Sequence, residues 1–183
     1  MLKSRIQIQA QLFLIWVFNC ILKILPTHIL RINFLKIFNA KIGDGTALHY
    51  GCYFTRPGRF SVGKYCTINF GCYFDTRGGI KIMDSVMIGH RTRIYTAGHI
   101  LDSESFSGFS KGVIIGDHAV IFPNSQIMPG VTVGRGSVVL TGSVVTKNIE
   151  DYVIVGGNPA NPVGFRSRNL NYKHQYKYWL PNA

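Results

Sequence analysis

The feature that most constrains the fold of this chain is an apolar residue that recurs every six positions. The period runs through residues 42–99, with short additions at 60–61 and 80–81, and again through residues 115–150. The recurring residues are Ile42, Leu48, Phe54, Val62, Ile68, Phe74, Ile82, Ile88, Ile94, Ile115, Ile121, Ile127, Val133, Val139 and Val145. A period of six fits neither an amphipathic helix nor an alternating strand. It predicts an all-β solenoid of very short strands, in which each coil buries its apolar face against the next coil.

Three hexads make one coil, so the repeat predicts about five coils. These are residues 42–59, 62–79, 82–99, 115–132 and 133–150. A small or slim side chain follows four residues after most of the apolar positions, as at Thr46, Cys52, Cys66, Cys72, Thr92, Ser125, Ser137 and Ser143. Glycine often comes directly after the apolar residue, at Gly43, Gly63, Gly89, Gly116 and Gly134. We expect these glycines to form tight corners with positive φ.

The period stops directly after His99, and residues 100–114 intervene before it resumes at Ile115. An insertion at a coil edge places a loop on a rigid scaffold, which is where functional sites tend to form. We therefore expect a loop beside His99 that acts as a lid and as a wall for a substrate.

The first 41 residues do not repeat and are apolar and basic. The uninterrupted apolar run Leu12–Phe18 is shorter than the ~20 residues that span a bilayer, and Asn19 and Lys23 interrupt its continuation. No small-residue cleavage site follows it. Pro26 ends this helix, and Thr27 is the expected N-cap of a second one. Two interpretations remain open and are compatible: packing on the solenoid or on a neighbouring subunit, and contact with a membrane surface.

The formal net charge is +12, and it is concentrated at the two ends of the chain. Residues 1–41 and 163–183 contain no acidic residue, and all eight acidic residues lie between Asp44 and Asp151. Such ends favour an anionic partner, but no nucleic-acid-binding motif accompanies the charge. The chain thus divides into a helical segment (1–41), a solenoid domain (42–157) and a basic C-terminal extension (158–183).

Three of the four cysteines, Cys52, Cys66 and Cys72, occupy the slim inward position of the repeat, and the chain has no CxxC pair. We expect them to be buried and reduced, as small apolar residues are. Reduced cysteines predict a cytoplasmic protein, which the basic apolar N-terminus would hold at the inner face of the membrane as a peripheral protein.

The hexad pattern, "TAGH" before the insertion and "VVLTGSVVTKNI" followed by "YVIVGGNPA" resemble the hexapeptide-repeat acyltransferases. Within these the chain resembles the sugar O-acetyltransferases, such as the galactoside and maltose acetyltransferases. The resemblance implies a left-handed parallel β-helix, a homotrimer, and acetyl-CoA bound between neighbouring subunits as the co-substrate. It covers roughly residues 42–166.

His99 is the candidate catalytic base. Transfer of an acetyl group to a hydroxyl requires removal of the hydroxyl proton, and histidine titrates near neutral pH. In the family that the chain resembles, the histidine of the "TAGH"-like motif has this role. The six histidines otherwise include His90 and His118, whose spacing from His99 does not match a carbonic-anhydrase-like zinc site, so we expect no metal.

The resemblance also implies contacts with the acceptor sugar. Asn69 in "CTINFGC" lies thirty residues before His99, and the family has an asparagine in a similar motif at that interval. An alternative is that Asn69 adopts the left-handed conformation of a corner residue. Asp75 at the next corner is a second candidate for a sugar hydroxyl, although the corresponding acid of the family aligns near Arg77.

For coenzyme A the resemblance points to Thr141, Gly142, Thr146 and Lys147, with Arg166 as a further candidate for the nucleotide phosphates. Lysine would meet phosphate as a point charge. The chain departs from many relatives in having "VIFPN" at 120–124, where they have an aromatic residue that lines the thioester site. Phe122–Pro123 would reshape the acyl pocket, with acetyl as the expected group.

The sequence thus predicts an acetyl-CoA-dependent O-acetyltransferase that acts by direct transfer on a sugar of a bacterial surface polysaccharide or its precursor. The acceptor would be free, nucleotide-linked or lipid-linked. Alternatives are an N-acetyltransferase of a nucleotide-linked amino sugar, a carbonic-anhydrase-like enzyme and a non-catalytic β-helix.

Overall fold

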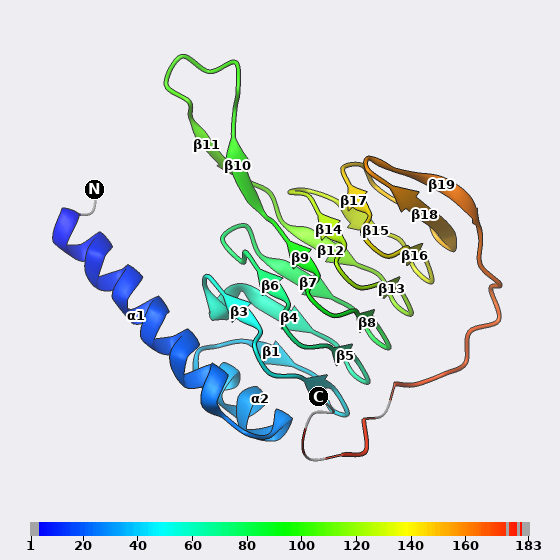
Figure 1. Cartoon of the computed structure of the whole chain (residues 1–183), viewed down its shortest axis with the longest axis horizontal. Helices are drawn as coiled ribbons and strands as arrows, with labels where there is room; N and C mark the ends of the chain where they lie inside the picture. The colour runs from blue at the N-terminus through cyan, green and yellow to red at the C-terminus, as the bar shows by residue number, and fades with distance from the viewer. Residues whose placement is uncertain (1–3, 175, 179, 181–183) are drawn as a thin grey trace.

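The computed structural model describes residues 4–174, 176–178 and 180. Its centre is a solenoid of short parallel strands that stack coil on coil, which confirms the predicted all-β solenoid and its N-terminal helical segment (Figure 1). Five full coils are followed by the beginning of a sixth, where Ile149 bridges to Val133 and β18 continues the second sheet.

Three parallel sheets form the sides of the solenoid. Sheet A contains β1 (Lys41–Ile42), β4 (Phe60–Val62), β7 (Ile80–Ile82), β12 (Val113–Ile115) and β15 (Thr132–Val133). Sheet B contains β2 (Ala47–Leu48), β5 (Thr67–Ile68), β8 (Met87–Ile88), β13 (Val120–Ile121), β16 (Val138–Val139), β18 (Val153–Gly157) and β19 (Ala160–Phe165). Sheet C contains β3 (Tyr53–Phe54), β6 (Tyr73–Phe74), β9 (Arg93–Ile94), β14 (Gln126–Ile127) and β17 (Val144–Val145). We name the corners of each coil by the sheets that they join: A–B, B–C and C–A.

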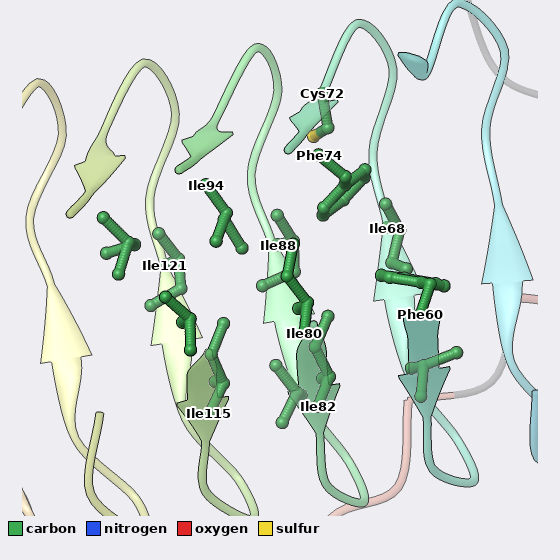
Figure 2. Packing of buried hydrophobic residues seen from close by; sticks show 14 of the residues in the cluster. Phe60, Ile68, Cys72, Phe74, Ile80, Ile82, Ile88, Ile94, Ile115 and Ile121 are labelled. Atoms are coloured by element: carbon green, nitrogen blue, oxygen red, sulfur yellow. The ribbon is translucent and has the colours of Figure 1, made fainter. Parts of the chain in front are cut away.

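The six-residue period predicts the register of these sheets correctly. Phe54 pairs with Phe74, and Phe74 pairs with Ile94, so apolar side chains of equivalent hexads lie directly above one another. Figure 2 shows Phe74 and Ile94 of this stack, and its labelled residues from three sheets point into the same interior. The slim positions are equally buried: Ser125 and Ser137 are fully enclosed and donate hydrogen bonds to backbone carbonyls. Each coil is therefore filled by its own repeat and sealed by the next.

The expectation of positive φ at the glycines of the repeat is wrong. Positive φ occurs two residues later in the A–B corner, at positions that include Gly45, Tyr65 and Ser85. The glycines have a different role, because a Cβ atom on Gly43 would lie 2.6 Å from the backbone of Gly63 in the next coil. A Cβ on Gly116 would likewise lie 2.7 Å from the Arg135 nitrogen. These glycines permit the close approach of successive coils.

The first coil is covered by two helices, α1 (Arg5–Ile24) and α2 (His28–Ile37). The predicted N-cap is confirmed, since the Thr27 hydroxyl accepts a hydrogen bond from the Leu30 amide at 3.2 Å. Arg31, a basic residue of α2, is only 1% exposed. Its Nε donates to the Leu48 carbonyl at 2.8 Å, and burial lowers the pKa of the guanidinium. The helix α2 therefore packs on the solenoid.

Asn19 attaches α1 to the edge of sheet C. Its amide nitrogen donates to the Phe54 carbonyl at 3.0 Å, and its oxygen accepts from the Phe54 amide at 2.9 Å. Asn19 and Lys23 interrupt the apolar run but not the helix, which ends at Ile24, shortly before Pro26 as predicted. By length and composition alone α1 could cross a membrane, and little of it is buried. Its side chains Phe18 and Leu22 pack in the core, whereas Phe13 and Trp16 are exposed.

The insertion after the third coil is an ordered hairpin. Strands β10 (Ala97–His99) and β11 (Gly108–Ser110) pair in antiparallel fashion, and Figure 1 shows them projecting from the solenoid. We call residues 97–110 the arm. Coil stacking continues beneath it, since β7 and β12 pair directly. His99 therefore lies in the arm, and not at the end of the third coil as the repeat predicts.

The far end of the solenoid is covered by the antiparallel pair β18 and β19, which extends the ordered domain from residue 157 to Phe165. The described residues that follow contain no helix or strand and run back along the solenoid (Figure 1). Tyr172 packs on His118 with ring centroids 5.1 Å apart, and the Lys173 ammonium lies 4.8 Å from the Tyr65 ring centroid. The described part of the basic extension therefore packs against the solenoid of the same chain.

Asn19→Leu should lower the free energy of unfolding by about 2–4 kcal/mol, because it leaves the amide and carbonyl of Phe54 without partners in an apolar contact. Urea denaturation would measure the loss, and hydrogen exchange should accelerate at the Phe54 amide. The exposed Asn33→Leu in α2 is the matched control and should be nearly neutral. Equal stability of the two variants would contradict the role of Asn19.

The buried cysteines should react with thiol reagents only when the protein opens. Burial raises the pKa of the Cys66 thiol to about 11, and burial with the neighbouring Cys52 raises the pKa of Cys72. Cys20 on α1 is exposed and serves as the internal control. Mass spectrometry after iodoacetamide treatment should find Cys20 modified first. Equally rapid labelling of Cys72 would contradict the structure.

Candidate active site

His99 is held by the arm on the outside of the solenoid. It is the last residue of β10 and pairs with Gly108 of β11. Its imidazole ring is exposed and lies parallel to the ring of Phe106, with 4.4 Å between the ring centroids. Among the described residues no side chain or backbone group forms a hydrogen bond with this imidazole. Stacking on Phe106 therefore fixes the ring plane and leaves both nitrogens available to a substrate.

Three arginines share a cleft with His99. The cleft has a volume of about 340 Å³ and lies between the arm and the C–A corners of the first two coils. Its residues are Arg56, Arg59, Arg77, Ala97, Gly98, His99, Gly108, Phe109 and Ser110. No acidic residue lines it, and Arg59 donates from a guanidinium nitrogen to the Arg77 carbonyl at 2.6 Å. The cleft is thus a positively charged pocket beside an accessible imidazole.

Asp75 does not face this cleft, which corrects its assignment as a sugar contact. Its side chain is completely buried, and the guanidinium of Arg77 donates two hydrogen bonds to it, at 2.8 and 3.0 Å. The Thr96 amide donates a further one at 3.2 Å. Burial acts to raise the pKa of Asp75, but the hydrogen bonds from Arg77 and Thr96 outweigh it and the pKa is lowered. Asp75 therefore positions Arg77, whose own side chain is 51% exposed.

Asn69 lies at the B–C corner, and the structure does not bring it into the His99 cleft of the same chain. It does not adopt positive φ, so the alternative of a left-handed corner residue is wrong. Its Nδ2 donates to the Ile88 carbonyl of the next coil at 2.8 Å. The side chain is half-buried, and Phe70 and His90 stack on the same edge of the solenoid.

The expected coenzyme residues also lie on separate corners. Thr141 and Gly142 are exposed at the B–C corner, where Gly142 has φ of +72° and its amide donates to the Pro123 carbonyl at 3.0 Å. Nothing lies within 4 Å of the position that a Cβ of Gly142 would take, so this corner is open to a ligand. Thr146 and Lys147 are exposed at the C–A corner. One chain therefore presents two halves of the expected site on two edges.

Arg166 is used within the chain, which argues against its expected role at the nucleotide phosphates. Its guanidinium donates to the His118 carbonyl at 3.0 Å and to the Tyr172 hydroxyl at 2.8 Å. It also lies over the Tyr172 ring, 5.4 Å from the centroid. These contacts belong to the A–B corner and attach the C-terminal extension to it.

The three histidines considered for a metal lie on three different edges of the solenoid. His90 is at the B–C corner, His99 is in the arm at the C–A corner, and His118 is at the A–B corner. Within residues 4–174, 176–178 and 180, no group of three histidine, cysteine or acidic side chains could hold a metal ion.

Sequence reasoning missed the arginines of the cleft and Phe106. A signal for two of them was present, because Arg56 and Arg77 follow the equivalent residues Phe54 and Phe74 by two and three positions. Phe106 lies inside the insertion, outside the repeat, where no register relates it to His99.

Comparison with known proteins supports the resemblance to the hexapeptide-repeat acyltransferases. The pattern described as "Bacterial transferase hexapeptide (six repeats)" matches residues 112–147. The chain is 29% identical over 130 residues to WcaF of Escherichia coli, which is named as a colanic acid biosynthesis acetyltransferase, with 71% of each chain covered. It is 28% identical to the galactoside O-acetyltransferase of Escherichia coli, over 80% of this chain and 72% of the relative.

Among solved structures, a hexapeptide-repeat acetyltransferase of Vibrio cholerae in complex with acetyl coenzyme A superposes with a TM-score of 0.79. The two chains are 25% identical, and the match covers 88% of this chain and 90% of the other. These similarities confirm the predicted resemblance.

Asp75→Asn should destabilise the protein by about 1–3 kcal/mol at pH 7, because the buried side chain at position 75 would lose the charge that accepts hydrogen bonds from Arg77 and Thr96. Because the folded-state pKa of Asp75 is lowered, its contribution is complete above the ordinary carboxyl pKa of about 3.9 and is lost as the pH falls through the lower folded-state pKa. The difference in melting temperature between variant and wild type should therefore shrink in acid. Asp102→Asn on the exposed arm is the control, and a pH-independent difference for Asp75→Asn would contradict the ion pair.

Proposed function

We propose that this chain, an acetyltransferase of the hexapeptide-repeat family, transfers the acetyl group of acetyl-CoA to a hydroxyl of a sugar. The sugar would belong to a bacterial surface polysaccharide or its precursor. The single observation that carries the proposal is the accessible imidazole of His99 in a cleft between the arm and the solenoid. The similarity to WcaF and to a galactoside O-acetyltransferase supports a carbohydrate acceptor, and the acetyl coenzyme A complex of the Vibrio cholerae structure supports the donor.

In this mechanism His99 accepts the proton of the sugar hydroxyl while the oxygen attacks the thioester carbon. The tetrahedral intermediate carries a negative charge that a backbone N–H can stabilise. The imidazolium then returns the proton to the departing thiolate sulfur of coenzyme A, so that the ester and the free thiol are the products. Direct transfer is favoured over an acyl-enzyme because Cys52, Cys66 and Cys72 are buried in the core.

The two halves of the expected site suggest assembly from several copies of the chain. His99 and Lys147 lie along the C–A edge, whereas Asn69 and Gly142 lie along the B–C edge. In a homotrimer, the B–C edge of one subunit would face the C–A edge of the next and complete the site. Asn69 of one subunit would then bind the acceptor beside His99 of its neighbour, and Thr141, Gly142, Thr146 and Lys147 would bind coenzyme A.

The proposed location is the cytoplasmic face of a membrane. Three free cysteines in the core are compatible with a reducing compartment. The exposed apolar residues of α1, among them Phe13 and Trp16, are available for peripheral contact with lipid.

The proposed reaction is tested by incubating the full-length protein with labelled acetyl-CoA and a panel of free, nucleotide-linked and lipid-linked sugars. Mild base removes an acetyl ester and leaves an acetamide. A label that mild base releases supports O-transfer. A base-resistant label would instead support the N-acetyltransferase of an amino sugar, and no labelled product from any sugar would contradict the proposal.

His99→Ala should reduce the acetyl-transfer rate by roughly 10²–10⁴, the usual effect of removing a positioned general base. The melting temperature should change little, because the imidazole is exposed and stacks only on Phe106. His118→Ala is the control and should keep most of the activity, since His118 lies on another edge. Turnover near the wild-type rate in His99→Ala would exclude it as the base.

A further inference from the structure

An apolar groove runs between α1 and the outer face of sheet C. Its apolar walls are Ile8, Leu12 and Ile15 on one side and the stacked rings of Tyr53 and Tyr73 on the other, Gln11 and Thr55 also line it, and its volume is about 500 Å³. The helix residues recur at intervals of three and four, so they form one face of α1. Asn19 attaches the same helix to Phe54, which fixes the position of this face relative to the tyrosines.

The groove and the His99 cleft share two residues. Arg56 and Arg77 line both, so the apolar groove leads to the arginines and the arginines lead to His99. The carboxylate of Asp75 holds the Arg77 guanidinium in place. None of the residues that line either space is acidic, and Arg59 adds a third positive charge on the cleft side.

An apolar groove followed by positively charged arginines fits a ligand that has an apolar chain and an anionic group. A guanidinium presents several N–H donors in a plane that matches the oxygens of a phosphoryl group, and two arginines that line the same space favour such an anion. An uncharged free sugar would carry neither an anion for the arginines nor a chain long enough to fill the apolar part of the groove. A nucleotide-linked sugar would use the arginines and could stack its base on Tyr53 and Tyr73, but it would place the polar edge of the base against Ile8, Leu12 and Ile15.

We propose that the acceptor is a saccharide linked through a phosphoryl group to a lipid, with the lipid chain in the groove, the phosphoryl group at Arg56 and Arg77, and the sugar beside His99. This inference rests on the proposed function and names the class of its acceptor. The lipid chain enters between α1 and sheet C, so the same helix that covers the first coil also recognises the substrate.

Farnesyl phosphate, an isoprenoid phosphate without a sugar, is the probe for the groove and the arginines. Its binding to the full-length protein is measured by isothermal titration calorimetry below its critical micelle concentration. We expect farnesyl phosphate to bind at least tenfold more tightly than either farnesol or glycerol 3-phosphate, because neither of these fills both parts of the site.

Two variants and two matched controls locate the binding. Leu12→Gln in the groove and Arg56→Gln at its end should each weaken farnesyl phosphate binding at least tenfold. Phe13→Gln changes the adjacent residue, which is exposed and does not line the groove, and Arg135→Gln removes an exposed positive charge at the A–B corner. Both controls should bind as the wild type does.

Several results would overturn the proposal. Equal affinity for glycerol 3-phosphate and farnesyl phosphate would show a site for anions alone. Phe13→Gln could weaken farnesyl phosphate binding as much as Leu12→Gln does, and both variants could also bind phosphatidylglycerol vesicles more weakly than the wild type. That result would show adsorption of α1 to lipid surfaces in place of a specific groove. A change of oligomeric state in Leu12→Gln, measured by analytical ultracentrifugation, would show that another subunit occupies the groove.

The outcome is independent of the proposed reaction, because farnesyl phosphate carries no acceptor hydroxyl of a sugar and its binding requires no turnover. Acetyl transfer to a soluble sugar with no binding of farnesyl phosphate would overturn this inference and leave the proposed function intact. Binding of farnesyl phosphate as expected, with no acetyl transfer to any sugar, would support the groove and contradict the proposed function.

Discussion

The structure depends on the sealing of each coil by the next, and this makes the first and last coils its critical points. A two- or three-residue strand has no stability alone, so the exposed backbone groups of a terminal coil must find other partners. At the first coil the side chains of Asn19 and Arg31 supply them, to Phe54 in sheet C and to Leu48 in sheet B. At the last coil the antiparallel strand β19 does so. The helices and the final hairpin are therefore part of the solenoid fold.

The same stacking determines where chemistry can occur. The interior is filled by the recurring apolar and slim residues, and the glycines bring the coils close together. Functional groups are confined to the corners and to the arm. Because equivalent corners of successive coils lie above one another, each edge of the molecule is a column of residues separated by about one coil in the sequence. The arginines of the cleft, Arg56 and Arg77, belong to such a column.

Most of the solenoid could be predicted from the sequence because its stability comes from a local repeat. The spacing of Phe54, Phe74 and Ile94 predicted which residues pair across coils. The predicted positive φ of the repeat glycines was wrong. These glycines permit the close approach of neighbouring coils, and the distance between backbones cannot be obtained from a one-dimensional pattern. The roles of Asp75 and Arg166 were not predictable for a related reason: a charged residue at a corner can face a ligand or satisfy the chain itself, and only the neighbours in space decide between these. Phe106 is outside the repeat altogether.

The arm has a thermodynamic property that follows from its place in the stack. Its two strands leave and re-enter the solenoid at neighbouring points, because β7 and β12 remain paired beneath it. The entropic cost of closing a loop rises only slowly with its length, so lengthening, shortening or exchanging the tip between His99 and Gly108 would disturb no core contact. A chain of this kind can change the surface presented beside His99 while the coils stay constant. The sequence of the hairpin tip can therefore vary independently of the contacts that stabilise the solenoid.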